Sequence, residues 1–83
     1  MNVIDGIKLV LRNTLQLGDR VEQFDTSTQL FGTLPEFDSM AVVTVITALE
    51  EQFQIQVDDE DITAETFETV GSLARLVEGK LSA

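Results

Sequence analysis

The sequence predicts an all-α fold: a small four-helix bundle with three main helices, one short helix and a long loop between the first two main helices. Three stretches, around residues 2–17, 39–53 and 69–81, carry apolar residues at the spacing of an amphipathic helix. Apolar and polar residues alternate only over residues 53–57, which we interpret as a helix end followed by an extended link. A chain of 83 residues is short enough that we expect a single domain, 1–83, with a small core.

The first helix is expected over about residues 2–17, and Gly18 is well placed to stop it. Leu9 falls outside the apolar stripe of this helix. Residues 19–38 show no sustained period, and an irregular stretch of that length is usually functional. Three apolar side chains are expected to tie this loop to the core: Leu30, Phe31 and Leu34.

The second helix is expected over residues 39–53, with Asp38 or Ser39 as its N-cap. The opposite face of this helix is apolar near its start and acidic near its end. The predicted core face consists of Val42, Val45, Ile46, Leu49 and Phe53. The predicted outward face consists of Met40, Val43, Thr44, Thr47, Glu50 and Glu51.

A short helix of one or two turns is expected over residues 62–67, and Thr69 is placed to cap the last helix. The acidic run at residues 58–61 fails as an EF-hand loop, because no glycine falls at position 6 and no glutamate at position 12. We interpret this run as a solvated acidic face and expect no metal site. The core anchors among the aromatic residues are expected to be Phe31, Phe53 and Phe67.

Composition excludes several function classes. The chain has 15 acidic and 5 basic residues, a net charge of -10, and neither His nor Cys. That charge repels nucleic acid and anionic membranes and favours partners with basic surfaces. A Ser-His-Asp or Cys-His catalytic site, a disulfide and a thiolate metal site are all excluded in this chain alone.

The distribution of apolar residues bears on location. No run of 18 or more apolar residues is present, so no membrane span is predicted. The first residues lack the basic and apolar regions of a signal peptide. We therefore expect a cytoplasmic protein, and a monomer.

Ser39 is the strongest candidate for a functional residue. It stands at the start of a helix, where backbone N–H groups and the helix dipole favour a negative group such as a phosphoester. Met40 and Val43 beside it are apolar without a place in the core, which indicates a docking patch. The alternative is that Ser39 only caps the helix, which is the ordinary role of a serine at such a position.

Three blocks of sequence in the right order resemble the acyl carrier protein family over essentially the whole chain. They are Asp38-Ser39-Met40, the stretch Ala48-Leu49-Glu50-Glu51-Gln52-Phe53, and Phe67-Glu68-Thr69-Val70-Gly71-Ser72-Leu73. The resemblance implies that 4'-phosphopantetheine from coenzyme A is esterified to Ser39 by a separate Mg²⁺-dependent phosphopantetheinyl transferase. It also implies that Asp38 helps to hold the metal bound by that transferase.

The chain departs from the usual fatty-acid carriers around this site. Leu34-Pro35-Glu36-Phe37 stands where those carriers have a glycine, and Ala41 and Thr44 stand where they have acids. This variant resembles stand-alone carriers of specialised bacterial gene clusters, including exosortase and exopolysaccharide systems. The acyl cargo and the pathway stay open among fatty acid, polyketide and specialised synthesis.

The sequence thus predicts a carrier and not an enzyme, because Ser39 has no base to activate it in this chain. The expected partners are the transferase and acyl-loading and acyl-using enzymes with basic docking surfaces, and an apolar cleft for the acyl chain is also expected. Two alternatives stay open: a peptidyl or aminoacyl carrier with the same modification, and an unmodified acidic helical adaptor. The expected partner-binding residues are Met40, Val43, Thr44, Glu50 and Glu51.

Overall fold

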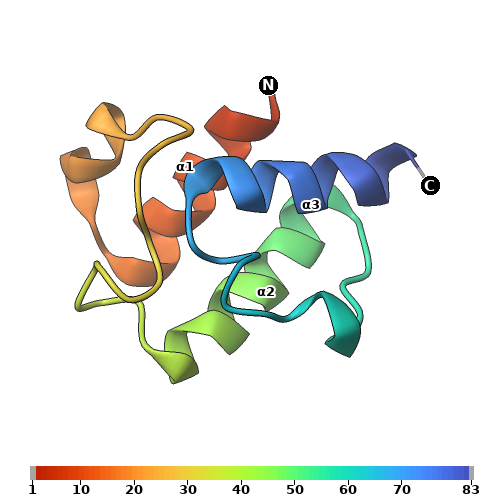
Figure 1. Ribbon diagram of the computed structural model, residues 1–83. Helices are drawn as coiled ribbons and strands as arrows, with labels where there is room; N and C mark the ends of the chain where they lie inside the picture. The colour runs from red at the N-terminus through yellow and green to blue at the C-terminus, as the bar shows by residue number, and fades with distance from the viewer. Residues whose placement is uncertain (1, 83) are drawn as a thin grey trace.

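The computed structural model describes residues 2–82 and confirms the all-α fold. Within those residues no strand forms, and a single isolated bridge pairs Gln29 with Thr69. In Figure 1, α3 lies in front of α1 and α2 lies below both. Helix α1 packs against α2 and α3, whereas α2 and α3 touch each other less. The elements in order are α1 (Val3–Leu15), the 3-10 helix η1 (Gly18–Gln23), α2 (Ser39–Phe53), the 3-10 helix η2 (Asp59–Asp61) and α3 (Val70–Ser82).

Helix α1 begins after Asn2, whose side chain caps it, and ends at Leu15, two residues before the expected end. The expectation that Gly18 stops the helix is wrong, because Gln16 already adopts the left-handed conformation that ends it, with φ of 55°. The chain turns there because the next residue, Leu17, is buried in the core. Gly18 instead begins η1, a helix that the sequence pattern did not predict.

The long loop before α2 is fastened to the segment before α3 by backbone hydrogen bonds. The N–H of Leu30 donates to the carbonyl of Glu68 at 2.7 Å, and the N–H of Phe31 donates to the carbonyl of Phe67 at 3.0 Å. Leu30 is fully buried, and Phe31 is half-buried. Leu34 is also half-buried against the core, so all three predicted anchors contact it.

Helix α2 has the predicted bounds, and its predicted inner stripe faces inward. Val45, Ile46 and Leu49 are buried, whereas Val42 and Phe53 are half-buried at the two ends of the stripe. The ring of Phe53 lies against Gly6 of α1, where an added Cβ would come within 2.5 Å of it. The absence of a side chain at position 6 therefore allows α1 and α2 to approach closely at this crossing.

The short helix was expected over residues 62–67, but helical geometry occurs at η2 instead, and turns follow it. Asp58 and Asp61 form a reciprocal capping box, which explains the shift, because these acidic side chains satisfy the backbone N–H groups of the turn. Both carboxylates also pair with Lys80. Asp58, Asp59 and Glu60 are exposed, as expected for a solvated acidic face, whereas Asp61 is half-buried and departs from that interpretation. Thr69 caps α3 as predicted, accepting the N–H of Ser72 at 3.0 Å.

One hydrophobic core joins the three α-helices, η1 and the long loop, and no polar side chain is buried within residues 2–82. In the same part of the chain, no helix has the length and apolar character needed to span a membrane. The buried core residues are Ile7, Val10, Leu11, Leu15, Leu17, Val21, Leu30, Phe37, Val45, Ile46, Leu49, Phe67, Val70, Leu73, Ala74 and Val77.

Candidate functional site

Ser39 is the first residue of α2, and Asp38 is its N-cap. Asp38 has an extended backbone, and its Oδ1 accepts the N–H of Ala41 at 2.9 Å. Ser39 is exposed, and no group within residues 2–82 forms a hydrogen bond with its hydroxyl. The hydroxyl is therefore not used to cap the helix, and it stands beside backbone N–H groups that favour a bound anion.

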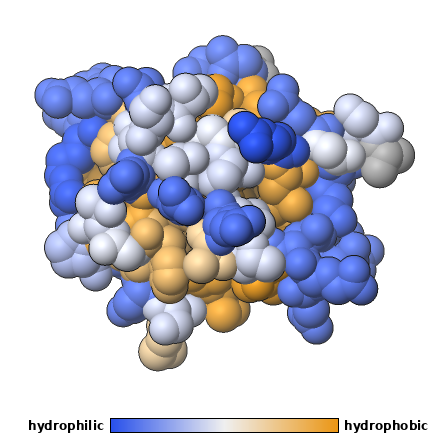
Figure 2. Space-filling view, in the orientation of Figure 1, coloured by the Kyte–Doolittle hydropathy of each residue, from blue (hydrophilic) through white to orange (hydrophobic). Residues whose placement is uncertain are grey.

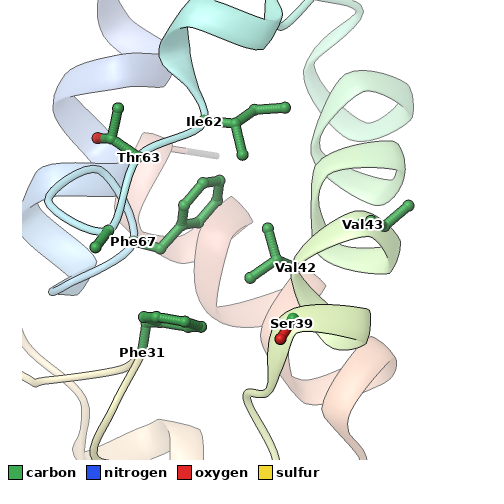
Figure 3. A pocket seen from close by; sticks show the side chains of 8 residues that line it. Phe31, Ser39, Val42, Val43, Ile62, Thr63 and Phe67 are labelled. Atoms are coloured by element: carbon green, nitrogen blue, oxygen red, sulfur yellow. The ribbon is translucent and has the colours of Figure 1, made fainter.

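An apolar hollow of about 370 Å³ opens beside Ser39. In Figure 3, α2 contributes one side of it, and Ile62 and Phe67 contribute the other. Figure 2 shows apolar surface in the lower middle of the molecule, bordered by hydrophilic side chains. The residues that line the hollow are Phe31, Ser39, Val42, Val43, Ile62, Thr63, Ala64 and Phe67. Ser39 is thus joined to a cavity with a mainly apolar lining.

Phe37 connects the loop before Ser39 to the walls of this hollow. Its ring is only 2% exposed and makes edge-to-face contacts with Phe31 and Phe67, with centroids 6.0 and 6.1 Å apart. Phe31 and Phe67 both line the hollow. Phe37 therefore links the backbone that leads to Ser39 with two residues that line the hollow, Phe31 and Phe67. Phe37 lies in a stretch without periodicity, so no sequence pattern assigned it to the core.

An ion pair fastens the same loop to η1. Arg20 of η1 pairs with Glu36, which lies just before Phe37. The side-chain hydrogen bond from Arg20 holds the pKa of Glu36 below its ordinary value. The loop that leads to Ser39 is thus fixed by the buried ring of Phe37 and by the ion pair between Arg20 and Glu36.

The structure divides the five residues predicted to bind partners. Met40 and Val43 are 81% and 65% exposed, and Thr44 is exposed beside them in the first turns of α2. Glu50 and Glu51 lie about three turns beyond Ser39 along the helix. Only the first three are therefore neighbours of Ser39.

The two glutamates have different surroundings. Glu50 is half-buried, and its Oε2 accepts the N–H of Val57 at 2.9 Å, so it fastens the link that follows α2. Glu51 is exposed and borders a second hollow, of about 230 Å³, between α1 and α2. Leu9, which falls outside the predicted stripe of α1, lines this second hollow.

Several residues of the site are not among those predicted from the sequence. Val42 and Phe67 were assigned to the core, and they line the hollow as well. Ile62 is 39% exposed. The one sequence signal for it is that a large apolar residue directly follows the acidic run without belonging to any apolar period. Within residues 2–82, no group of three or more acidic side chains is arranged to hold a metal ion.

Comparison with known proteins identifies the family. The family described as "Phosphopantetheine attachment site" matches residues 10–77. The acyl carrier protein of Wolinella succinogenes is 34% identical over 79 residues, which cover 94% of this chain and 96% of that protein. The chain belongs to the acyl carrier protein family. Acyl carrier proteins of this family use phosphopantetheine as their prosthetic group, and this confirms the resemblance seen in the three sequence blocks.

Solved acyl carrier proteins have the same fold. The holo acyl carrier protein of Nitrosomonas europaea is 52% identical, with a TM-score of 0.93 and full coverage of both chains. The holo acyl carrier protein of Geobacter metallireducens is 23% identical, with a TM-score of 0.79 over 99% of this chain and 88% of that one. A carrier protein of Agrobacterium tumefaciens, solved with an engineered Bradyrhizobium japonicum glycine:[carrier protein] ligase, is 21% identical, with a TM-score of 0.79 over 93% of this chain and 97% of that one.

The residues at the site fit the prosthetic group of an acyl carrier protein. Phosphopantetheine requires a hydroxyl for its phosphoester, and Ser39 offers an exposed one at the start of α2. The phosphate charge suits the free N–H groups of a helix start. The adjoining apolar hollow offers a place for a hydrophobic cargo.

Proposed function

We propose that Ser39 is the residue that bears phosphopantetheine, and that acyl groups are carried from it as thioesters. The observation that supports this most directly is the cap geometry of α2. Because Asp38 satisfies the N–H of Ala41, the Ser39 hydroxyl is exposed and available for an ester bond. The hollow beside it gives the acyl chain an apolar surface.

The chemistry of attachment needs a base, which this chain does not supply. Ser39 Oγ forms the new bond to the phosphorus on the pantetheine side of coenzyme A as the phosphoanhydride bond breaks. Adenosine 3',5'-bisphosphate leaves, and the serine proton passes to a base. The chain has no His or Cys, and no described side chain contacts the hydroxyl through a hydrogen bond. The base therefore belongs to the transferase, and the chain acts as a carrier without catalytic activity of its own. When bound, the prosthetic group supplies the thiol that forms the thioester.

Asp38 has two roles in this proposal. Its Oδ1 caps α2. We also propose that its carboxylate helps to hold the Mg²⁺ of the transferase. Within the hollow, each methylene of an acyl chain that leaves water contributes about 0.8 kcal/mol. Val42, Ile62 and Phe67 are the apolar side chains placed to make those contacts.

Partner enzymes are proposed to dock on the first turns of α2. Met40, Val43 and Thr44 present an exposed surface beside Ser39, and the net charge of -10 suits basic partner surfaces. Glu51 is exposed and can contribute charge to this recognition. The carboxylate of Glu50 is engaged with Val57, so we assign it a structural role in place of a docking role. In this proposal the carrier acts as a monomer that meets its partners in turn.

The test is peptide-level mass spectrometry after incubation with coenzyme A, Mg²⁺ and a promiscuous phosphopantetheinyl transferase. We expect one added group on the peptide that contains Ser39, none in Ser39→Ala, and unchanged modification in the control Ser27→Ala. Ser27 is an exposed loop serine, so its replacement removes a hydroxyl without touching the site. Modification of Ser27, Ser72 or Ser82 would refute the assignment. Complete absence of modification would favour an unmodified adaptor.

A further inference from the structure

Lys80 near the end of α3 bridges two carboxylates of the segment between α2 and α3. Its Nζ lies 2.7 Å from Asp61 Oδ2 and 3.1 Å from Asp58 Oδ2. The Lys80 side chain is only 23% exposed, so most of it lies against the protein surface. The same Asp61 oxygen also accepts the N–H of Asp58 at 3.1 Å. The bridge therefore holds η2 through its N-cap, Asp58, and its last residue, Asp61.

The segment held in this way leads directly into one wall of the hollow. Ile62, Thr63 and Ala64 follow η2 and line the cavity beside Ser39. The N–H of Ile62 donates to the carbonyl of Asp59 at 3.1 Å, so the first wall residue is continuous with η2. In Figure 3, the Ile62 side chain extends toward α2 across the hollow. A displacement of η2 would consequently change the width of the cavity.

Other hydrogen bonds act on the far side of this wall: Thr63 Oγ1 lies 2.9 Å from Thr66 Oγ1, and Ser72 Oγ of α3 donates to the carbonyl of Thr66 at 2.8 Å. Helices α2 and α3 touch each other less than either touches α1. Glu50 fastens the link at Val57, which precedes η2. Residues 58–61 are four consecutive acids, and without a cation they repel one another. Lys80 is the basic side chain that offsets this repulsion.

We propose that Lys80 is a positioning residue that holds the 62–64 wall against α3 and so determines how well the hollow shelters an acyl group. This inference rests on the proposed function, because the cargo must enter the hollow for the wall to matter. It concerns this chain's own ion pairs, which act on the cavity without touching the cargo.

The first experiment measures amide hydrogen exchange in the unmodified protein, which needs no cargo. Lys80→Met removes the charge and keeps the stem, and Lys80→Arg keeps the charge. Lys8→Met is the matched control, since it makes the same change in net charge on α1, where the Lys8 ammonium donates one hydrogen bond among residues 2–82, to the carbonyl of Glu22. For Lys80→Met we expect exchange roughly twofold to fivefold faster at Asp61, Ile62 and Thr63, with little change in α2.

Lys80→Arg and Lys8→Met should retain the exchange rates of the parent chain at those amides. Rates that are unchanged in Lys80→Met would overturn the proposal. Equal acceleration in Lys8→Met and Lys80→Met would also overturn it, because the effect would then come from net charge. Acceleration across all helices in Lys80→Met would assign Lys80 a role in global stability and would likewise contradict a local positioning role.

The second experiment measures cleavage of the thioester by hydroxylamine, which yields a hydroxamate and a free thiol, in holo protein loaded with acetyl or octanoyl groups. In the parent chain, the octanoyl thioester should be cleaved more slowly than the acetyl thioester. In Lys80→Met, octanoyl cleavage should be roughly twofold to fivefold faster and acetyl cleavage unchanged. Equal cleavage of both cargoes in the parent chain would refute the sheltering role of the hollow. Preserved octanoyl protection in Lys80→Met would refute the role of Lys80 but not the sheltering role of the hollow.

Discussion

The carboxylate of Asp38 accepts the backbone N–H of Ala41 at 2.9 Å, which makes Asp38 and not Ser39 the cap of α2. Both residue types are good caps, so the sequence admitted either. The structure decides between them and separates two functions at adjacent positions. Asp38 stabilises the helix, and Ser39 presents its hydroxyl to solvent.

This separation predicts different costs for two neighbouring substitutions. Asp38→Ala should lower the free energy of unfolding by about 1 kcal/mol, and Asp38→Asn should lower it little, because asparagine caps equally well. Ser39→Ala should leave stability nearly unchanged. Denaturant unfolding followed by circular dichroism measures all three. A loss in Ser39→Ala as large as that in Asp38→Ala would show that the serine contributes to the cap.

The same Asp38 variants test the proposed role of its charge. Asp38→Asn keeps the cap and removes the negative charge, so modification of Ser39 should slow while stability is retained. The measurement is the initial rate of phosphopantetheine transfer at fixed transferase and Mg²⁺. If Asp38→Asn is modified as fast as the parent chain, Asp38 has no part in holding the metal.

The two faces of α2 predict unequal truncation costs. Leu49 is fully buried, so Leu49→Ala should destabilise the protein by about 2–5 kcal/mol, which is enough to unfold many domains of this size. Val43 is 65% exposed, so Val43→Ala should cost much less and should weaken partner binding instead. Thermal unfolding of both variants provides the comparison. Equal losses at the two positions would contradict the assignment of the faces.

Two glycines of α3 predict opposite effects of one substitution. A Cβ at Gly71 would lie 2.8 Å from the backbone carbonyl oxygen of Thr26, whereas nothing lies within 4 Å of one at Gly79. Gly71→Ala should destabilise by about 1–3 kcal/mol, because the loop must move away from the helix. Gly79→Ala should stabilise by up to about 1 kcal/mol through helix propensity. If denaturant unfolding shows that both substitutions raise the free energy of unfolding, the loop at Thr26 moves away from the helix at little cost.

The bridge between Lys80 and Asp61 predicts a particular pH dependence. The side-chain hydrogen bond with Lys80 lowers the pKa of Asp61, and the hydrogen bonds with Asp61 and Asp58 raise the pKa of Lys80. The contribution of the bridge is therefore fully present above the ordinary aspartate pKa of about 3.9 and is lost as the pH falls through the lowered pKa of Asp61. At the alkaline end, it is fully present below about 10.4 and is lost as the pH rises through the raised pKa of Lys80.

Carboxyl NMR of Asp61 checks the acidic side of this prediction. In Lys80→Met the pKa of Asp61 should move up, because its largest stabilising partner is gone. The control Lys8→Met should leave the titration midpoint of Asp61 in place. A midpoint that does not respond to Lys80→Met would show that the ion pair is not formed in solution.

The sequence by itself determined the helices that have a strong period, and the bounds of α2 agree with residues 39–53. It also singled out Ser39, because a serine after an acid and before an apolar patch at a helix start is a local pattern. The two 3-10 helices, η1 and η2, were not predicted from the sequence. Helix η1 has no apolar period, and η2 depends on a capping box between Asp58 and Asp61 that competes with the turns after it. Local side-chain hydrogen bonds decided those positions, and hydrophobic periodicity does not report them.

Only the tertiary structure decided which residues form the hollow and what holds it. Phe31, Val42 and Ile62 come from three segments that meet because the long loop hydrogen-bonds to the residues before α3. Lys80 reaches Asp58 across 22 residues of chain, and no local pattern signals such a pair. The physical reason is that periodicity records which side of one element faces the core. The neighbours on that side depend on how all the elements pack together.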